Sequence, residues 1–448
     1  MARTLYTLFF YLMMPFILLR LAYRSIRAPE YGDRVRERFG LFTAPSFDDC
    51  IWVHAVSVGE TIAAVPLVRQ LQQRYPDRAI VITTMTPTGS ERVKALLADE
   101  VFHVYAPYDL PGSIKRFLTR VSPRVLIIME TELWPNTIHY CYQNAIPVVL
   151  ANARLSEKSV NGYRKLPSLS GGMLEEISSI AAQHSNDGDR FLSLGLPREN
   201  LSITGSIKFD IDLPEVLVEQ ARCLKTQWTN ASVIDDGEET VSGCESGKRL
   251  NSRLVVLAAS THEGEEELIL SAYQHLLVEL EGGTNAPPLL ILVPRHPERF
   301  SRVVVMSEQL GFETIRRSSG VSVLSSTQVM VGDTMGELLL LYGCADIAVV
   351  GGSLVSNGGH NMLEAAAWAL PIVTGSSHYN FFDISNKLQE ADALVVANDE
   401  TALLRELQSL LEDPMKRRRM GSAALQVVEQ NRGSLQRLVD VIDPYLAR

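Results

Sequence analysis

Three chemically active side chains follow apolar segments in the first half of the chain, at the points where strands are predicted to end. Glu60 comes after IWVHAV, Glu130 ends RVLIIME, and Lys208 follows NLSITGS. Transfer of a sugar to an alcohol requires a base near the attacking hydroxyl and charge near a departing phosphate. Two carboxylates and a lysine on one sheet edge have the chemistry for both roles.

Each of these side chains also has a purely structural interpretation. Ser57 and Glu60 have the Ser-x-x-Glu spacing of a capping box, in which the carboxylate only accepts a backbone N–H. Glu130 and Lys208 can form an ordinary ion pair, and Glu132 can be a solvated charge favoured at a helix start. The sequence leaves these alternatives open.

A basic segment after the predicted strand IPVVLAN is a candidate for acceptor binding. It carries Arg154, Lys158, Arg164 and Lys165, and we expect it to be a loop. Basic side chains of this kind suit a phosphorylated acceptor. A solvated loop that binds nothing is the alternative.

Strand ends in the second half offer groups suited to a nucleotide. Arg295 closes LLILVP and is placed to reach a phosphate, although Pro297 can simply begin a helix there. Glu337 is expected at the third position of a helix, as a cap. Gly336 beside it permits close approach of a base or ribose.

The stretch VVGGSLVSNGGHNMLEAAAW is the richest in candidate ligands. Two glycine pairs, 351–352 and 358–359, precede a helix expected to begin near Asn361. Glycines there would let backbone N–H groups face a nucleotide phosphate at the positive end of the helix. Glu364, in the first turn, would accept ribose hydroxyls or act as a cap.

Other phosphate-binding motifs are missing from the sequence. It contains no G-x-x-x-x-G-K-[ST] loop and no G-x-G-x-x-G after the first strand, which argues against ATPase and dinucleotide-binding functions. It also lacks an Asp-x-Asp dyad to hold a metal on a diphosphate. We therefore expect no metal and no other cofactor.

Two α/β domains are needed to position these residues. Strand-like runs alternate with helical patterns between residues 50 and 205, and again from residue 253 onward. Apolar runs this continuous are typical of parallel strands that are buried on both faces. Because ligands bind beyond the carboxyl ends of such strands, we expect two Rossmann-like domains facing across a cleft. The polar stretch 226–252 is expected to be a loop insertion.

Composition excludes several classes of protein. The 448 residues are 46% hydrophobic, enough for about two to three domains. The five cysteines show neither Cys-x-x-Cys nor metal-ligand spacing, which argues against a disulfide framework or structural zinc. A net charge of -10 argues against a nucleic-acid partner.

The N-terminus predicts a membrane anchor. Residues 5–19, LYTLFFYLMMPFILL, carry no charge, and the first 40 residues hold seven arginines against three carboxylates. No small-residue cleavage site follows, so we expect an uncleaved anchor with the remainder cytoplasmic, where the arginines attract anionic lipids. A helix that lies in the interface is the alternative.

Taken together, the segments resemble the Kdo (3-deoxy-D-manno-octulosonic acid) transferase family of lipid A assembly. The matching strings span most of the chain in order: WVHAVSVGET (52–61), TTMTPTGSERV (83–93), YAPYDLPG (105–112), METELWPN (129–136), NARLSEKS (152–159), GSIKFD (205–210), STHEGEEE (260–267), VPRHPERF (293–300), MGEL (335–338) and GGSLVSNGGHNMLEAAA (351–367).

The resemblance implies a GT-B fold, in which Glu60 is the general base and Glu130 and Lys208 stabilise the transition state. The donor is then CMP-Kdo, the acceptor the tetraacyl disaccharide precursor of lipid A (lipid IVA), and the location the cytoplasmic side of the inner membrane. The residues implied in CMP binding are Pro294, Arg295, Met335, Gly336, Glu337, Asn361, Met362, Leu363 and Glu364. The expected domains are an anchor (1–24), an acceptor-binding domain (25–212), a linker with the polar insertion (213–252) and a donor-binding domain (253–448).

The chain departs from the family pattern in the last motif. Ser356-Asn357 stand where the family more usually has Pro-Arg, and Met362 stands where it has Pro. These departures bear on the donor contacts. A membrane-surface GT-B transferase that uses a UDP-sugar, or a non-catalytic nucleotide-sugar binding module, are the alternatives in function. The number of sugars added and the oligomeric state are not determined by the sequence.

Overall fold

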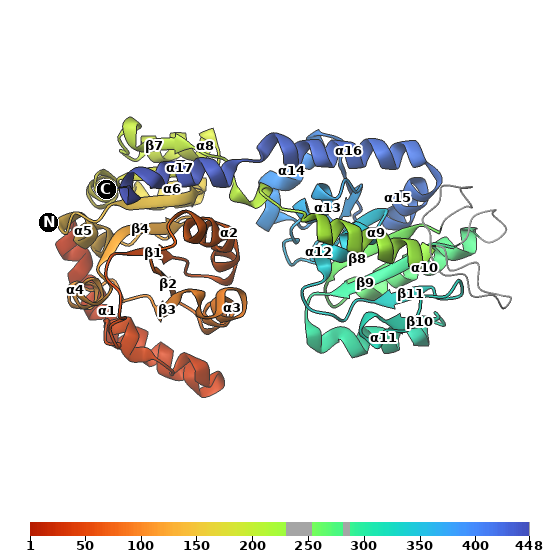
Figure 1. The fold of residues 1–448 in the computed structure, drawn as a ribbon, viewed down its shortest axis with the longest axis horizontal. Coiled ribbons are helices and arrows are strands. Elements are labelled where there is room, and N and C mark those ends of the chain that lie inside the picture. Colours follow the sequence, from red (N-terminus) through yellow and green to blue (C-terminus); the bar gives the residue numbers. More distant parts are fainter. Residues whose placement is uncertain (230–252, 281–286, 448) are drawn as a thin grey trace. The chain divides into compact units, whose positions relative to one another are not determined.

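The computed structural model describes residues 1–229, 253–280 and 287–447. They form two compact units, Met1–Asp210 with Asn431–Arg448, and Ile211–Gln430. Each unit contains a seven-stranded sheet whose paired strands are all parallel (Figure 1). The predicted α/β architecture of two Rossmann-like domains is confirmed.

The first unit is built on a sheet in the order β3-β2-β1-β4-β5-β6-β7. Its strands are β1 (Cys50–His54), β2 (Ile80–Thr84), β3 (Phe102–Tyr105), β4 (Pro123–Met129), β5 (Val148–Ala153), β6 (Ser179–Ala182) and β7 (Leu201–Ile203). Its helices are α1 (Ala2–Arg27), α2 (Val58–Arg74), α3 (Pro87–Leu97), α4 (Pro111–Val121), α5 (Pro135–Gln143), α6 (Glu157–Tyr163), α7 (Pro167–Glu175), α8 (Ser185–Ser193) and α17 (Ser434–Leu446). Strand order reverses between β1 and β4, where ligands bind in such sheets.

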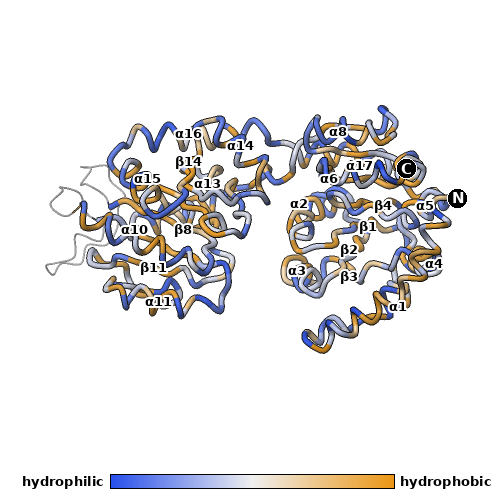
Figure 2. Tube along the Cα trace, turned by 180° about the vertical axis from the view of Figure 1, so that it is seen from behind, coloured by the Kyte–Doolittle hydropathy of each residue, from blue (hydrophilic) through white to orange (hydrophobic). Residues whose placement is uncertain are grey.

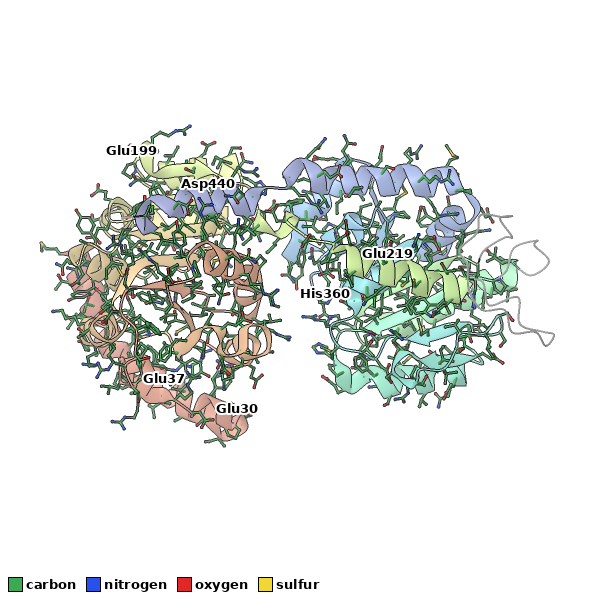
Figure 3. All side chains as sticks on the ribbon, viewed as in Figure 1. Glu30, Glu37, Glu199, Glu219, His360 and Asp440 are labelled. Atoms are coloured by element: carbon green, nitrogen blue, oxygen red, sulfur yellow. The ribbon has the colours of Figure 1, made fainter. Side chains whose placement is uncertain are left out.

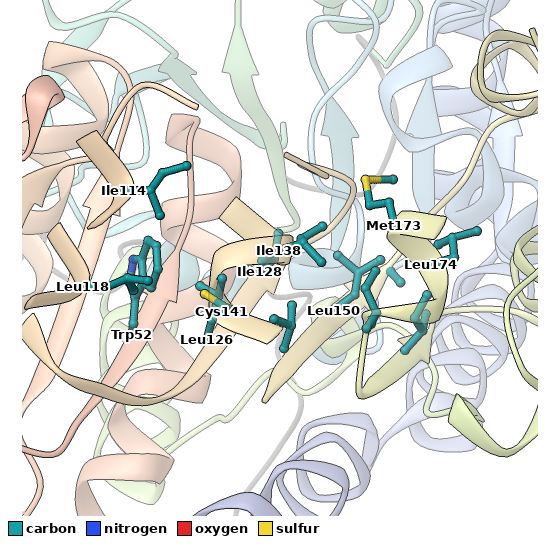
Figure 4. Packing of buried hydrophobic residues seen from close by; sticks show 14 of the residues in the cluster. Trp52, Ile114, Leu118, Leu126, Ile128, Ile138, Cys141, Leu150, Met173 and Leu174 are labelled. Carbon is teal, nitrogen blue, oxygen red and sulfur yellow. The ribbon is translucent and has the colours of Figure 1, made fainter. Parts of the chain in front are cut away.

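Hydrophobic packing on both faces explains why these strands read as continuous apolar runs. Successive side chains of a strand point to opposite faces. Trp52 of β1 therefore packs with Leu126 on one face, while Val53 packs with Ile127 on the other. Figure 4 shows the first of these clusters, and Figure 2 shows hydrophobic residues along the strands of both units.

The second unit repeats the plan with a sheet in the order β10-β11-β9-β8-β12-β13-β14. Its strands are β8 (Val255–Thr261), β9 (Leu289–Pro294), β10 (Thr314–Arg316), β11 (Val329–Val331), β12 (Ile347–Val350), β13 (Ile372–Thr374) and β14 (Leu394–Val396). Its helices are α9 (Glu215–Thr229), α10 (Glu265–Leu280), α11 (Phe300–Gln309), α12 (Leu338–Cys344), α13 (Leu363–Ala367), α14 (Phe382–Glu390), α15 (Glu400–Glu412) and α16 (Pro414–Asn431). The ends of β9, β8 and β12 are therefore adjacent.

The predicted donor-binding domain, residues 253–448, extended too far toward the C-terminus. Residues 431–448 belong to the first unit, because α17 buries Leu438 and Ile442 in its core. Asp210 accepts the N–H groups of Gly433 and Leu435, both at 2.6 Å, and so fixes the N-terminus of α17. In this position α17 covers apolar side chains of the strands of the first unit.

The predicted linker was also partly wrong. Residues 215–229 form α9, which belongs to the second unit and buries Ala221 and Trp228. Its last residues fall within the polar stretch 226–252 that was expected to be a loop. The rest of that stretch, 230–252, lies outside the described residues.

The predicted anchor forms a continuous helix, α1, that is long and apolar enough to cross a membrane by length and composition. One side of α1 packs against the first unit: Met14 is buried with Tyr108 and Leu110. Leu8 and Leu12, on the other side, are 67% and 66% exposed. A helix with both an internal contact and an open apolar face is suited to lie along a membrane surface.

Candidate active site

Glu60 lies in the first turn of α2, and both of its carboxylate oxygens are held. Oε2 accepts the Val56 N–H at 2.9 Å, and Oε1 accepts the Ser57 hydroxyl at 2.8 Å. The N–H of Glu60 in turn donates to Ser57 Oγ at 3.2 Å. The cap is therefore present. Because a carboxylate has about four acceptor positions, these two contacts fix Glu60 and still leave it able to take a proton.

Electrostatics favour Glu60 as a base at neutral pH. Only 8% of the residue is exposed, and burial raises its pKa from 4.5 to about 7. The negative charges of Glu130 and Glu132 add to this rise, which places all three carboxylates within electrostatic reach of one another. A general base is most effective when its pKa is near the working pH.

Glu130 stands immediately after β4 in a strained backbone conformation. Its φ is +57°, in the left-handed region that residues other than glycine rarely adopt. Its N–H donates to the Ala151 carbonyl at 2.9 Å, so the pairing with β5 holds it there. Such strain concentrates at functional sites, where the surrounding structure maintains it.

Lys208 is brought to Glu130 by a turn of the chain across the sheet edge. Its Nζ is 3.5 Å from Glu130 Oε1, although β5 and β6 separate β7 from β4. After β7 the chain forms a short 3-10 helix, η5 (Ile207–Phe209). The ion pair left open by the sequence is thus present, and both side chains remain partly exposed, at 30% and 25%.

Asn152 positions this turn, and it was not among the residues expected from the sequence. Its Oδ1 accepts the Ile207 N–H at 3.2 Å, and the residue is fully buried. Its amide nitrogen has no hydrogen-bond partner among the residues that the structure describes. An asparagine within the apolar strand β5 was the available signal, because a buried amide requires a partner.

The basic segment is not the expected loop. Residues Glu157–Tyr163 form α6, since the Ser156 hydroxyl caps the helix by accepting the Ser159 N–H. Lys158 is exposed, and Arg164 donates to Ser193 Oγ at 3.2 Å. Arg154 is half-buried at the end of β5. An acceptor-binding role for these three basic residues stays a prediction.

Arg295 lies within electrostatic reach of Glu364 in the second unit. Arg295 is exposed at the end of β9, and its N–H donates to the Thr261 carbonyl at 2.9 Å. Burial raises the pKa of Glu364, while the Asn361 side chain and the Arg295 charge oppose the rise. A guanidinium and a carboxylate at one sheet edge suit a phosphate and a ribose respectively.

Other expected donor ligands differ in what they present. Pro294, Met362 and Leu363 are buried, so their side chains belong to the core and only their backbone is available. Met335 and Gly336 are exposed, and Gly336 has a φ of +87° with open space around its Cα.

Glu337 is more constrained than the sequence indicated. It is the N-cap residue of α12 rather than its third residue. Both carboxylate oxygens pair with Arg317, at 3.2 Å each, and the Thr334 hydroxyl also donates to it. Its role in donor binding stays a prediction.

The glycine-rich loop does not offer its N–H groups to a ligand, contrary to expectation. Glu265, fully buried at the start of α10, accepts the N–H groups of Gly352, Ser353 and Leu354 at 2.7 to 3.0 Å. Those of Gly358 and Gly359 donate to Ser377 Oγ and the Gly352 carbonyl. A side chain of the protein therefore occupies the anion-binding concavity, and the sequence showed it only as one acidic residue among three.

Three histidines that were not among the expected site residues lie near the ends of β8, β9 and β12. His262 Nε2 is 2.8 Å from His360 Nε2, the two rings are stacked, and the His296 ring lies 5.4 Å from that of His262. Burial lowers the pKa of His360 to about 4 and also lowers the pKa of His262, and the charge of Arg295 adds to both effects. Figure 3 marks His360 in the second unit. Their positions after predicted strands were the only signal in the sequence that could have identified these histidines.

No group of three or more His, Cys, Asp or Glu side chains within residues 1–229, 253–280 and 287–447 is arranged to hold a metal ion. Metal-independent chemistry stays a prediction.

Replacing Glu265 by alanine is expected to destabilise the second unit. Three N–H groups of the glycine-rich loop and that of His262 would lose their acceptor, which costs about 1–3 kcal/mol for each group left unsatisfied. At the low end, the four groups together lose about 4 kcal/mol, which would lower the melting temperature by roughly 8–16 °C in a thermal scan. Glu267→Ala is the matched control, because Glu267 is exposed and caps only Gly264. Equal melting temperatures for both variants would contradict this role of Glu265.

Comparison with known proteins places the chain among glycosyltransferases. Residues 33–211 match the family model for 3-deoxy-D-manno-octulosonic-acid transferase, and residues 313–427 match that of glycosyl transferases group 1. A 3-deoxy-D-manno-octulosonic acid transferase of Haemophilus influenzae is 44% identical over 100% of both chains. One from Bordetella pertussis is 32% identical, covering 88% of this chain and 87% of its own.

Solved structures share the fold at low sequence identity. The UDP-GlcNAc 2-epimerase of Neisseria meningitidis is 13% identical, covers 88% of this chain and 100% of its own, and has a TM-score of 0.55. Together with the group 1 match, this likeness supports a GT-B architecture.

Proposed function

The chain belongs to the family of Kdo transferases of lipopolysaccharide biosynthesis, and we propose that it transfers Kdo from CMP-Kdo to the tetraacyl disaccharide precursor of lipid A at the cytoplasmic face of the inner membrane. The observation that carries the mechanism is the buried carboxylate of Glu60, whose pKa is raised to about 7 beside the Glu130–Lys208 pair.

The proposed step is an inverting displacement. The acceptor hydroxyl oxygen forms a bond to the anomeric carbon of Kdo while the bond from that carbon to the CMP phosphate oxygen breaks. The hydroxyl proton passes to Glu60, and CMP leaves with the electron pair. Glu130 stabilises positive charge that develops on the sugar, and Lys208 stabilises negative charge. No metal is needed, because CMP-Kdo has a single phosphate.

The donor-binding role of the second unit predicts selective stabilisation by CMP. Arg295 is exposed, lies within electrostatic reach of Glu364, and supplies a charged donor for the phosphate. CMP is expected to raise the melting temperature more than UDP, and Arg295→Ala should weaken CMP binding by at least about tenfold. Arg419→Ala, a change at an exposed arginine of α16, is the control. Stronger stabilisation by UDP would favour a transferase that uses a UDP-sugar.

A direct assay tests the function as a whole. Purified protein is incubated with CMP-Kdo and the acylated disaccharide, and products are weighed by mass spectrometry. A product heavier by one or more Kdo units is expected. Binding of CMP without any product would instead favour a non-catalytic nucleotide-sugar binding module.

The packing of α1 supports a membrane helix that lies in the interface rather than one that stands free of the domain. Thr7 donates to Asn136 Oδ1 at 3.0 Å, and Phe10 makes an edge contact with Trp134, with ring centroids 6.5 Å apart. The open face is apolar along the helix. Its exposed large residues are Leu5, Leu8, Phe9, Leu12, Phe16, Leu19, Tyr23 and Ile26. Arg20, Arg24 and Arg27 would meet anionic lipid.

Acidic substitutions on this face are expected to release the protein from membranes. Leu8→Glu with Leu12→Glu should lower partitioning onto vesicles of phosphatidylethanolamine and phosphatidylglycerol by at least about tenfold, since buried methylenes contribute about 0.8 kcal/mol each. Ile203→Glu is the control, because Ile203 is an exposed apolar residue elsewhere on the same unit. Sedimentation with vesicles measures the effect. Unchanged partitioning of the double variant would refute a role for this face.

A further inference from the structure

An apolar cavity of about 560 Å³ lies in the first unit beside the membrane helix. Its walls come from α1, from the loop between β4 and α5, and from α6 and α7. Leu133, Trp134, Leu166, Leu169 and Met173 supply most of the apolar lining. The volume falls within the roughly 300–1,000 Å³ of ligand sites, and the described groups of the Kdo transfer step do not use it.

The cavity connects the membrane helix with the candidate catalytic carboxylates. Tyr6 of α1 forms part of one wall, and Glu132 forms part of another. Glu132 stands two residues after Glu130, and its charge raises the pKa of Glu60. It also raises the pKa of Tyr163, a further wall residue, although burial is the larger cause. A ligand in the cavity would therefore contact both the membrane helix and a carboxylate that acts on the base.

We propose that this cavity binds a fatty acyl chain of the lipid acceptor, an inference that rests on the proposed function. The apolar walls favour a hydrocarbon chain over a sugar, because burial of apolar surface drives such binding. Met173 has a flexible side chain that can adapt to a chain. The polar end of the occupant lies beside Glu132, two residues after Glu130, which suits the molecule whose hydroxyl reacts. A membrane phospholipid in the cavity would instead keep the acceptor, and therefore its reactive hydroxyl, out of the site.

Gly162 provides a way to fill the cavity without disturbing the fold. It lies on the cavity wall in α6, is exposed, and an added Cβ meets no atom within 4 Å. Gly162→Phe therefore places a ring where the acyl chain would lie. Gly172→Phe is the matched control. Gly172 is an exposed glycine of α7, also has open space at its Cβ, and does not line the cavity.

The test compares acceptors that differ only in acyl length. With long-chain acceptors, wild type and Gly172→Phe are expected to show kcat/KM at least about tenfold above that with short-chain acceptors. In Gly162→Phe this preference should fall to within about twofold, with the loss appearing in KM for the long-chain acceptor. Retained preference in Gly162→Phe, or none in wild type, would overturn the proposal.

Two further arms separate the possible failures. Vesicles of phosphatidylethanolamine and phosphatidylglycerol without acceptor should bind Gly162→Phe and wild type equally. Weaker binding of Gly162→Phe would assign the cavity to bulk phospholipid and overturn the assignment to the acceptor. If wild type forms no product from CMP-Kdo with any acceptor, the proposed function fails. The acyl site is then tested by binding alone: a thermal shift with long-chain acceptor that is equal in Gly162→Phe and wild type would refute it.

Discussion

Glu60→Gln is expected to lower kcat for Kdo transfer by about 10²–10⁴-fold, the usual contribution of a general base. The amide cannot take the acceptor proton, yet its oxygen can still accept the Val56 N–H that now holds the carboxylate. The fold and the thermal shift with CMP should therefore persist. Glu91→Gln is the control, because Glu91 is an exposed carboxylate in α3 of the same unit. A well-folded Glu60→Gln with wild-type kcat would exclude Glu60 as the base.

The pH profile provides an independent check of the same residue. Because burial raises the pKa of Glu60 to about 7, kcat/KM should increase with pH through about 7 and then level off as the carboxylate ionises. Stability has the opposite sign: the contribution of uncharged Glu60 is complete below pH 4.5 and is lost as the pH rises through about 7. The increase in kcat/KM should be absent from the residual activity of Glu60→Gln. Its persistence would assign the titration to another group.

Lys208→Ala is expected to lower kcat by about 10²–10³-fold, as removal of a preorganised charge does in other active sites. Lys208 is 30% exposed and 3.5 Å from Glu130, so its loss also leaves that carboxylate without its charged partner. Lys94→Ala, at an exposed lysine of α3, is the control. Single-turnover kinetics should show the defect in the transfer step. A change in KM alone would indicate that Lys208 only binds substrate.

Substitution of Asn152 tests the position of Lys208 without removing the lysine. Asn152→Ala keeps Lys208 but removes the acceptor of the Ile207 N–H, so the turn that carries the lysine loses its anchor. The expected effect on kcat is smaller than that of Lys208→Ala. If Asn152 acts only through Lys208, the double variant should lose no more than Lys208→Ala alone. Additive losses would contradict this positioning role.

Much of the fold was accessible from the sequence because its signals are local. Continuous apolar runs between helical patterns indicate buried parallel strands, and both sheets have that form. The cap at Glu60 was readable from Ser57 three residues before it. Helix α6 was predicted to be a loop because the segment contains Lys158, Arg164 and a glycine. The Ser156 hydroxyl, which caps the first turn, stabilises a helix there.

The family, the two α/β domains and the candidate residues at strand ends follow from the amino-acid sequence alone, because spacing along the chain carries that information. Which of those residues meet depends on the folded structure. Lys208 reaches Glu130 because the chain turns back over β5, where Asn152 holds it. Glu265 occupies the glycine-rich loop across 87 to 89 positions of sequence. The last helix joins the first unit. Contacts between distant segments depend on strand order, which local patterns do not specify.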